Sequence, residues 1–313
     1  ASDIWRVEAG SAVFAVKRAL AKLRVAADWR APDERNASAA EWLRLAANIV
    51  PGCAPKVIHH DPARGYFAMD YLPPERHPVW KSELRDGRID PDFAGQVGSA
   101  LAAIHAATAG DPGIARGFAF DAKFHAIRLE PYLEATARAH SALAANLMAL
   151  SRDTLARHEA LVHGDISPKN ILAGPTGPIF LDAECAWYGD PAFDVAFCLN
   201  HLLLKCVWKP AHAARYLGAF DALRAAYFGG RSAGSQARVA RLLPALTLAR
   251  IDGKSPVEYI VDERDKARVR AVVSPLVATP PRDLDTLRHV WPRAIAVGAG
   301  HAGARTHLRR GGL

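Results

Sequence analysis

The sequence predicts an α+β protein with two lobes, in which a small antiparallel sheet precedes a larger, mostly helical part. The first part of the chain alternates short apolar runs with turn signals around one amphipathic segment. Pro73-Pro74 then interrupts every regular pattern. Beyond that pair, alanine-rich segments with helical spacing dominate. We therefore place an N-terminal lobe at residues 1–72 and a C-terminal lobe at residues 73–297.

The N-terminal part predicts the order strand, strand, helix, strand, strand. Each strand pair flanks a turn that contains glycine, and the helix has apolar residues at helical spacing before it stops at Pro51-Gly52. The expected bounds are Ile4–Glu8, Ala12–Arg18, Arg35–Ile49, Lys56–His60 and Tyr66–Tyr71.

The C-terminal part is expected to be helical except for two short strands near its middle that carry polar motifs. The expected helices are Phe93–Thr108, Leu129–Leu150, Phe193–Trp208, Ala211–Phe228, Ala237–Arg250 and Asp262–Val277.

The composition fits a soluble globular protein, because 50% of the 313 residues are hydrophobic and 23% are charged. The sequence shows neither an apolar run long enough for a membrane span nor a signal-peptide layout. Its 4 cysteines lack C-x-x-C spacing, which favours free thiols and a cytoplasmic location. The net charge is +8, but three arginines fall in the tail 298–313, which we expect to be disordered. No nucleic-acid-binding signature accompanies the charge, so we expect neither nucleic acid nor membrane as a partner.

The most informative segment is Leu161–Leu172, with the sequence LVHGDISPKNIL. It places Asp165 and Asn170 in a loop between two apolar runs, and Asp182 and Glu184 follow the next apolar run. Phosphoryl transfer from ATP uses a carboxylate that orients the acceptor hydroxyl and oxygen ligands that hold Mg²⁺. A polar turn built from the same residues is the simpler alternative. It does not explain why acidic residues recur at the strand ends that follow.

The combination H-G-D-x-S-P-x-N-I-L, L-D-A-E and Gly189-Asp190-Pro191-Ala192-Phe193-Asp194 resembles the aminoglycoside phosphotransferase family. These are small-molecule kinases with a protein-kinase-like fold, alongside choline and methylthioribose kinases, and the resemblance covers about Ile4 to Val290. It implies a phosphotransferase that uses ATP and Mg²⁺ to phosphorylate a hydroxyl of a small molecule, such as a sugar or an amino alcohol.

The resemblance makes Asp165 the catalytic residue, which orients the acceptor hydroxyl and takes its proton late in the reaction. Asn170 and Asp182 are expected to bind Mg²⁺. Glu184 would face the same side as Asp182 on a continuing strand, either as a further metal ligand or in a structural salt bridge. His163 and Asp194 are expected to support the loop, Asp194 by accepting backbone N–H bonds.

Lys17, at the end of F-A-V-K, resembles the V-A-I-K lysine that contacts the nucleotide phosphates. Its expected acidic partner is Glu41 in the first helix, with Glu34 as a rival. The hinge that pairs with the adenine edge is expected at Met69, Asp70, Tyr71 and Leu72.

One expected part is missing from the sequence. Kinase-like folds cover the phosphates with a turn between their first two strands, and this sequence begins where that turn should end. The first strand is therefore expected to be absent, through truncation or because it is dispensable here. This departure leaves a catalytically weak or silent kinase-like binding protein as the alternative function.

The acceptor pocket of this family lies between the catalytic loop and the C-terminal helices. The expected lining residues are Trp187, His201, Arg250, Asp252 and Lys254, with Tyr188, Asn200 and Lys205 as further candidates. The segment from Leu248 to Pro256 could equally be a solvated connection. Aminoglycosides are polycations that need an acidic pocket, and the C-terminal half shows no dense acidic cluster. An aminoglycoside is therefore possible but not preferred, and the oligomeric state stays open.

Overall fold

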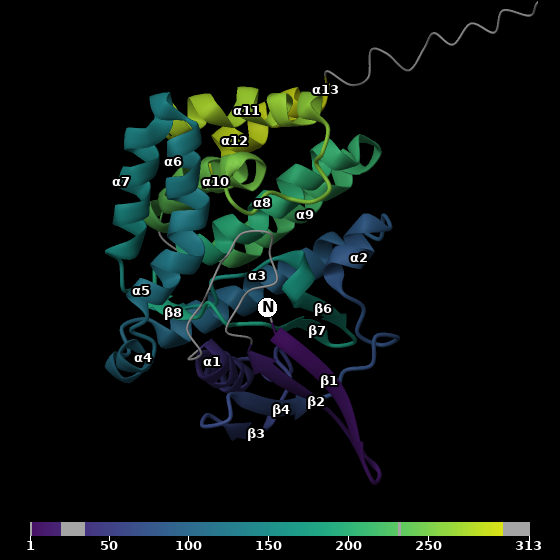
Figure 1. The fold of residues 1–313 in the computed structure, drawn as a ribbon. Coiled ribbons are helices and arrows are strands. Elements are labelled where there is room, and N and C mark those ends of the chain that lie inside the picture. Colours follow the sequence, from purple (N-terminus) through teal and green to yellow (C-terminus); the bar gives the residue numbers. More distant parts are fainter. Residues whose placement is uncertain (1, 20–34, 231–232, 297–313) are drawn as a thin grey trace, which may run out of the picture.

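The computed structural model describes residues 2–19, 35–230 and 233–296 (Figure 1). A small antiparallel sheet lies at one end of the molecule, and helices form most of the remainder. The expected α+β arrangement is confirmed. The expected boundary at residue 72 falls between the last strand of this sheet and the first helix beyond it. The expected tail 298–313 lies outside the described residues, as does Glu34.

The N-terminal sheet has four strands in the order β1-β2-β4-β3, all antiparallel. Gly10 (φ 61°) and Gly65 (φ 66°) occupy the left-handed region at the two hairpin turns, where glycine fits without a steric penalty. The strands are β1 Ser2–Ala9, β2 Ala12–Ala19, β3 Val57–Asp61 and β4 Tyr66–Asp70. Both predicted hairpins are therefore present, with ends within two residues of the expected ones.

Helix α1 (Arg35–Ile49) packs beside this sheet and has the bounds that the sequence predicts. Ala39, Trp42, Leu43 and Ala46 are almost fully buried, so the apolar stripe faces the sheet and the body of the molecule. This stripe fixes which face of α1 is left for solvent.

The long helix expected at residues 129–150 is instead broken into several pieces. A π-helix, η1 (His125–Glu134), contains Pro131, which removes a backbone donor from the helical ladder. The break before the next long helix lies at His140, which has φ −127° and ψ 78°. The pieces after η1 are α6 Ala135–Ala139, η2 Ser141–Leu143 and α7 Ala144–Leu155.

The five other predicted helices are present, shorter helices occur that the sequence analysis does not predict, and several helices begin at an aspartate cap. Asp90, Asp111, Asp262 and Asp283 each accept a backbone N–H from the first turn of the helix that follows. These helices are α2 Trp80–Arg85, α3 Pro91–Thr108, α4 Pro112–Gly117, α5 Asp121–Phe124, α8 Ala192–Trp208, η4 Pro210–His212, α9 Ala213–Phe228, α10 Ala233–Asp252, α11 Glu263–Ala278, α12 Leu284–Val290 and α13 Pro292–Ala296.

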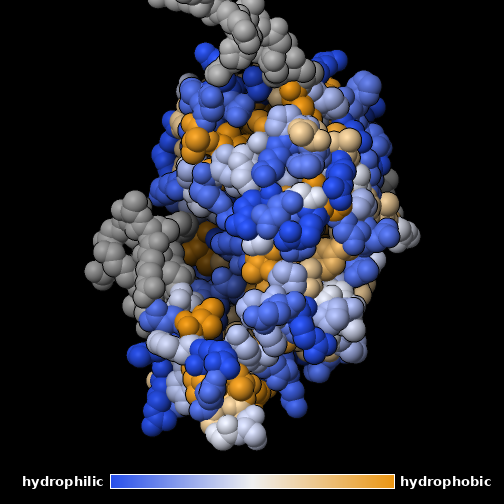
Figure 2. Space-filling model, turned by 90° about the vertical axis from the view of Figure 1, so that its right-hand side faces the viewer, coloured by the Kyte–Doolittle hydropathy of each residue, from blue (hydrophilic) through white to orange (hydrophobic). Residues whose placement is uncertain are grey.

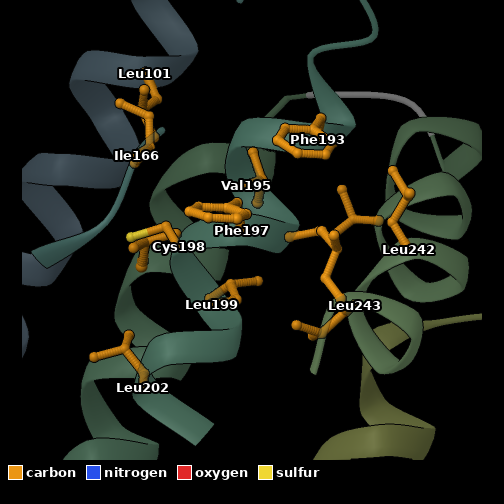
Figure 3. Packing of buried hydrophobic residues seen from close by; sticks show 14 of the residues in the cluster. Leu101, Ile166, Phe193, Val195, Phe197, Cys198, Leu199, Leu202, Leu242 and Leu243 are labelled. Carbon is orange, nitrogen blue, oxygen red and sulfur yellow. The ribbon is translucent and has the colours of Figure 1, made fainter. Parts of the chain in front are cut away.

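Helix α8 forms the centre of the helical body, because every residue from Ala192 to Val207 is buried. Figure 3 shows Phe193 and Phe197 of α8 in the same buried cluster as Leu242 and Leu243 of α10. A helix that is apolar all round must be enclosed by other elements. Any polar side chain on α8 is therefore held in a fixed, water-poor position.

Two short antiparallel sheets place the polar motifs next to α8. Strand β5 (Ala160–Val162) pairs with β8 (Trp187–Gly189), and β6 (Ile171–Gly174) pairs with β7 (Gly177–Phe180). The motif loop connects β5 to β6 through the short helix η3 (Pro168–Asn170). The loop therefore begins and ends at paired backbone, which positions its side chains.

Among the described residues, no helix combines the length and the apolar character that crossing a membrane would require. The face drawn in Figure 2 is mostly hydrophilic, and its hydrophobic residues lie in scattered patches. Cys53, Cys185, Cys198 and Cys206 are buried and free, as their spacing predicted.

Candidate active site

The motif loop is anchored at its start by Asp194, in the first turn of α8. The backbone N–H groups of His163 and Gly164 each donate to this carboxylate at 2.8 Å. Gly164 has φ 77°, and a Cβ there would lie 2.6 Å from the carbonyl oxygen of Cys185, so only glycine fits. Asp194 therefore makes the contacts expected of it.

Asp194 is itself contacted by His105, which in turn contacts Tyr227. Nε2 of His105 lies 3.3 Å from its Oδ2, and Nδ1 of His105 lies 2.9 Å from the hydroxyl of Tyr227. All three side chains are almost completely buried. The network connects α3, α8 and α9 to the start of the loop and satisfies the buried carboxylate.

His163 is enclosed and has its own partners. Its Nε2 lies 3.0 Å from the carbonyl oxygen of Leu181, and its ring packs edge-on against Trp42 at 4.6 Å between centroids. The backbone N–H of Asp165 donates to Nδ1, so Nε2 carries the proton. Burial lowers the pKa of His163, so the ring is neutral near pH 7. These contacts suit a supporting role.

Asp165 is buried between two cations. Its Oδ2 lies 2.9 Å from Nη2 of Arg128 and 3.3 Å from Nζ of Lys169. Burial alone would raise the pKa of Asp165, but Lys169 and Arg128 lower it below its ordinary value. The side chain is therefore a carboxylate at neutral pH, with its charge compensated.

Arg128 was not predicted as a site residue. It lies on the π-helix η1, and its Nε also donates to the carbonyl oxygen of Gly164. One guanidinium thus fixes both the loop backbone and the Asp165 carboxylate. π-Helical turns occur frequently at functional sites. Pro131, three residues on, was the available sequence signal for an irregular helix here.

Asn170 closes the other end of the loop. Its side-chain amide nitrogen donates to the backbone carbonyl oxygen of Asp165 at 3.0 Å. The backbone carbonyl oxygen of Asn170 accepts from the N–H of Leu181 at 2.9 Å. The first bond identifies the amide nitrogen, so the amide oxygen is the end left for a ligand. The second bond brings Asn170 next to the strand end that carries Asp182.

Asp182 has a strained backbone. With φ 66°, it is the one residue other than glycine with a positive φ in the part of the chain that the structure describes. Such conformations cost free energy and cluster at functional sites. The Asp182 side chain is 42% exposed, so this carboxylate remains accessible.

Lys17 connects the N-terminal sheet to these acidic residues. Its Nζ forms a salt bridge with Asp182 and lies 2.9 Å from Oε1 of Glu184. Burial would lower the pKa of Lys17, but Asp182 and Glu184 raise it above its ordinary value. Lys17 likewise lowers the pKa of Asp182, against the effect of burial. Lys17 and Asp182 therefore carry charge together.

The predicted pair of Lys17 with Glu41 is wrong. The Glu41 side chain is 52% exposed and pairs with Arg44 on the same helix, at 3.4 Å. The buried face of α1 is taken by its apolar stripe, so Glu41 points to solvent. Glu184 contacts Lys17 instead.

The donor set fits a hard divalent cation. Among the described residues, no three His, Cys, Asp or Glu side chains group closely enough for a metal site built from those residues alone. The amide oxygen of Asn170 and the accessible carboxylate of Asp182 supply two oxygen ligands, and Mg²⁺ characteristically takes one or two protein oxygens plus phosphate and water. These two residues would hold the cation together with a nucleotide.

The predicted hinge follows the central strand β4. Asp70 exchanges hydrogen bonds with the backbone of Lys56, through its own N–H at 3.0 Å and its carboxylate at 3.2 Å. Met69 is buried, and the guanidinium of Arg6 lies 5.2 Å from the ring centroid of Tyr71. Leu72 is half-buried at the start of the connection to α2. Adenine binding at this connection stays a prediction.

A pocket of about 200 Å³ opens beside Asp165. His201, Lys205 and Arg250 line it, as the sequence analysis expected. Residues not named as candidates also line it, and they are Lys81, Tyr132, Ser167, Pro168, Lys169, Phe197, Ser255, Pro256, Glu258 and Tyr259. They come from η1, α2, the motif loop with η3, α8 and the segment after α10, so their convergence depends on tertiary structure.

Three of the expected acceptor residues lie elsewhere. Trp187 is fully buried and stacks on Phe124 at 4.3 Å. Asp252 pairs with Arg270 at 2.6 Å and with His140. Neither these two residues nor Lys254 is part of the pocket lining, so their expected role in binding the acceptor stays a prediction.

Lys254 is 48% exposed and binds both carboxylate oxygens of Glu130 at 2.8 Å. Two further candidates are also absent from the lining. Tyr188 donates to the carbonyl oxygens of Thr108 and Glu159, and Asn200 donates to backbone within α8. The Tyr188 hydroxyl therefore connects the end of α3 to the residue before β5, and the Asn200 amide nitrogen bonds within its own helix.

The small sheet, the helical body and the segment Asp182–Glu184 that contacts Lys17 are the parts of a protein-kinase-like fold. The chain belongs to the phosphotransferase enzyme family, whose family model matches residues 3–229. In structure it is similar to a choline/ethanolamine kinase family protein from Mesorhizobium loti, with a TM-score of 0.52, 19% identity and 92% of each chain covered. The predicted fold class and family are confirmed.

Two relatives are methylthioribose kinases. The chain is 27% identical over 229 residues to the one from Pectobacterium atrosepticum, which covers 65% of this chain and 57% of the relative. It is 26% identical over 338 residues to the one from Yersinia pseudotuberculosis, which covers 98% of this chain and 75% of the relative. The chain thus spans less than two thirds of the length of the Pectobacterium relative.

Proposed function

We propose that this protein is a small-molecule kinase that transfers the γ-phosphoryl group of ATP to a hydroxyl group, with Mg²⁺. The proposal rests mainly on the position of Asp165, which borders the pocket of about 200 Å³. On its other side, Asn170 bonds to the backbone carbonyl of Asp165 and to the backbone N–H of Leu181. Leu181 precedes Asp182, which forms the salt bridge with Lys17. A carboxylate thus lies between a place for an acceptor and a place for a nucleotide. Family membership and the methylthioribose kinase relatives support the same reaction class.

In the proposed mechanism, Asp165 accepts a hydrogen bond from the acceptor hydroxyl and orients its oxygen toward the γ-phosphorus. A bond forms between these two atoms while the bond from the γ-phosphorus to the β,γ-bridging oxygen breaks, and ADP leaves. The hydroxyl proton passes to the Asp165 carboxylate late in this step, when the attacking oxygen has become acidic. Arg128 and Lys169 keep Asp165 ionised until then.

The nucleotide would be held by the groups that now pair with one another. Asn170 and Asp182 would bind the cation, which when present neutralises charge on the phosphates. Lys17 would exchange its salt bridge with Asp182 for the phosphate oxygens while keeping Glu184. The connection after β4 would pair with adenine through its backbone. These roles make Glu184 a partner of the lysine, the second of the two readings that the sequence left open.

The experiment is an ATP-consumption assay with Mg²⁺ over a panel of hydroxyl metabolites, with the Asp165→Asn variant run in parallel. Acceptor-dependent ADP release that disappears in the variant supports the proposal. Nucleotide binding without acceptor-dependent turnover would instead favour the catalytically silent binding protein. The pocket volume favours a small metabolite, and its basic lining gives no support to an aminoglycoside. The cytoplasmic location stays a prediction.

A further inference from the structure

The acceptor pocket holds more positive charge than its own carboxylates neutralise. Four cationic side chains and two carboxylates line it. Asp165 pairs with Lys169, and Glu258 pairs with Lys81. Lys205 and Arg250 remain, and neither forms a salt bridge with a carboxylate of the described residues.

Of these two cations, Lys205 gives the stronger evidence for a bound anion, because its side chain is only 1% exposed on the buried helix α8. Its Nζ lies 4.6 Å from the ring centroid of Tyr259 and 5.0 Å from that of Trp208. Aromatic faces attract a cation but do not replace a carboxylate or water. Burial and the neighbouring Lys81 lower the pKa of Lys205 to about 8. A buried ammonium in this setting favours a negatively charged ligand.

Unpaired polar atoms lie around the same pocket. Nε2 of His201, Nε of Arg250 and the hydroxyls of Ser167 and Tyr259 are buried, and none of them has a hydrogen-bond partner among the described residues. His201 is 7% exposed and Arg250 is 9% exposed. Buried polar groups are normally satisfied, so several orphans lining one cavity indicate a missing ligand. His201 lies one helical turn before Lys205 on α8, so the two side chains share a face.

We propose that the acceptor carries an anionic group, a carboxylate or a phosphate, that binds Lys205, Arg250 and His201 while its hydroxyl faces Asp165. This inference rests on the proposed kinase function and specifies its substrate class. Arg250 is already oriented by Ser255 and by the hydroxyl of Tyr132, and its unpaired Nε is available to the anion. The same arrangement disfavours choline-like amino alcohols and other cationic acceptors, which Lys205 would repel.

The first test compares acceptors that differ only in charge. Glycerol is compared with D-glycerate and with glycerol 3-phosphate, and D-ribose with D-ribonate and with D-ribose 5-phosphate. We expect kcat/KM to be at least tenfold higher for an anionic member than for its neutral counterpart, and the carboxylate and phosphate arms decide between the two anions. Equal or better turnover of the neutral members would overturn the inference while leaving the kinase function intact.

The second test does not depend on turnover. Binding of the same anions, and of inorganic phosphate, is measured by calorimetry for the wild type, Lys205→Met and Lys205→Arg. Lys266→Met on α11 is the control, because Lys266 is outside the pocket lining. We expect binding to weaken at least tenfold in Lys205→Met, with Lys205→Arg retaining most affinity and the control unchanged.

The outcomes separate the two proposals. Anion binding that depends on Lys205 without any ATP consumption would contradict the kinase function and leave an anion-binding pocket. Anion binding that Lys205→Met does not weaken, in a variant with an unchanged melting temperature, overturns the inference. Should Lys205→Met fail to fold, Arg250→Lys supplies the same comparison, because it keeps the charge but loses the Nε–H that the anion is proposed to accept.

Discussion

Nζ of Lys17 on β2 lies 2.9 Å from Oε1 of Glu184, which comes two residues after Asp182. The lysine is therefore held by the segment that also carries the proposed metal ligand, and not by helix α1. Both ends of this contact are almost completely buried, whereas Glu41 is exposed. We therefore expect Glu184, and not Glu41, to be the acidic residue that holds Lys17 for nucleotide binding.

We predict that Glu184→Gln weakens ATP binding and turnover about as much as Lys17→Met does, because the lysine loses the partner that holds it in place. Glu41→Gln is expected to change neither, since the Glu41 side chain is 52% exposed and pairs with Arg44 on the same helix. The measurements are calorimetric ATP affinity and kcat/KM. The double variant Lys17→Met, Glu184→Gln should lose little more than either single variant, because members of one unit are non-additive. Additive losses would show that the two residues act separately.

We predict that Asp165→Asn lowers phosphoryl transfer by about a hundredfold or more, the usual contribution of a positioned proton acceptor. Nucleotide affinity should change little, because Asp165 faces the pocket and not Lys17. Single-turnover kinetics and calorimetry separate the two effects. Asp153→Asn on α7 is a matched control, since this carboxylate is 54% exposed and pairs with Arg241. A variant that keeps most of its turnover would exclude Asp165 from the proton-accepting role.

We predict that Asp182→Asn abolishes the Mg²⁺ dependence of nucleotide binding while the protein stays folded. Asparagine tolerates the left-handed backbone found here at φ 66°, so the substitution removes the charge without adding strain. Asp182→Ala would mix both effects, because alanine disfavours that conformation. ATP affinity is measured with Mg²⁺ and with EDTA. Retention of the full difference between these two conditions in Asp182→Asn would contradict the metal assignment.

We predict that Lys205→Met stabilises the protein at pH 7, by at most about 3 kcal/mol, since each unit of pKa shift corresponds to about 1.4 kcal/mol. The pKa of Lys205 falls from 10.5 to about 8 on folding through burial and through Lys81 and Lys209, while Glu258 partly offsets them. Between these two values the unfolded chain binds the proton and the folded protein does not, so wild-type stability rises with pH.

The advantage of the methionine variant should therefore be largest below pH 8 and shrink as the pH approaches 10.5. Urea unfolding of both proteins at pH 7 and pH 10 measures this difference. The rings of Trp208 and Tyr259 also face Lys205, but an indole does not titrate and burial raises the pKa of the Tyr259 hydroxyl above that window. A stability difference of equal size at both pH values would show that folding does not lower the pKa of Lys205.

The local part of the site could be predicted from the sequence, because the loop residues lie in one short segment bounded by apolar strands. The Glu41 prediction failed although the signal was present: Ala39, Trp42 and Ala46 define the buried face of α1, and Glu41 lies off it. The sequence analysis names Glu184 as a candidate for a salt bridge. The amphipathic pattern of α1 indicates that Glu41 faces solvent, and the structure agrees with this pattern.

Other parts of the site could not be predicted, because they depend on packing between distant elements. The contact of Arg128 with Asp165 requires a π-helical turn, which has no reliable sequence pattern. Lys205 and Arg250 are candidates in the sequence analysis. That neither pairs with a carboxylate of the described residues follows only from the packing of α8 against α10. Trp187 was expected in the pocket, yet its size makes it a core residue stacked on Phe124.

Helix α8 begins at the carboxylate that holds the catalytic loop and later presents His201 and Lys205 to the pocket. Under the proposed function, this one helix would set the distance between the hydroxyl that is phosphorylated and the charge that binds Lys205. We therefore expect acceptors to be selected by how far their hydroxyl lies from their charge, as well as by ring shape. Moving a cation by one turn along this helix would retune acceptor choice while leaving the catalytic loop undisturbed.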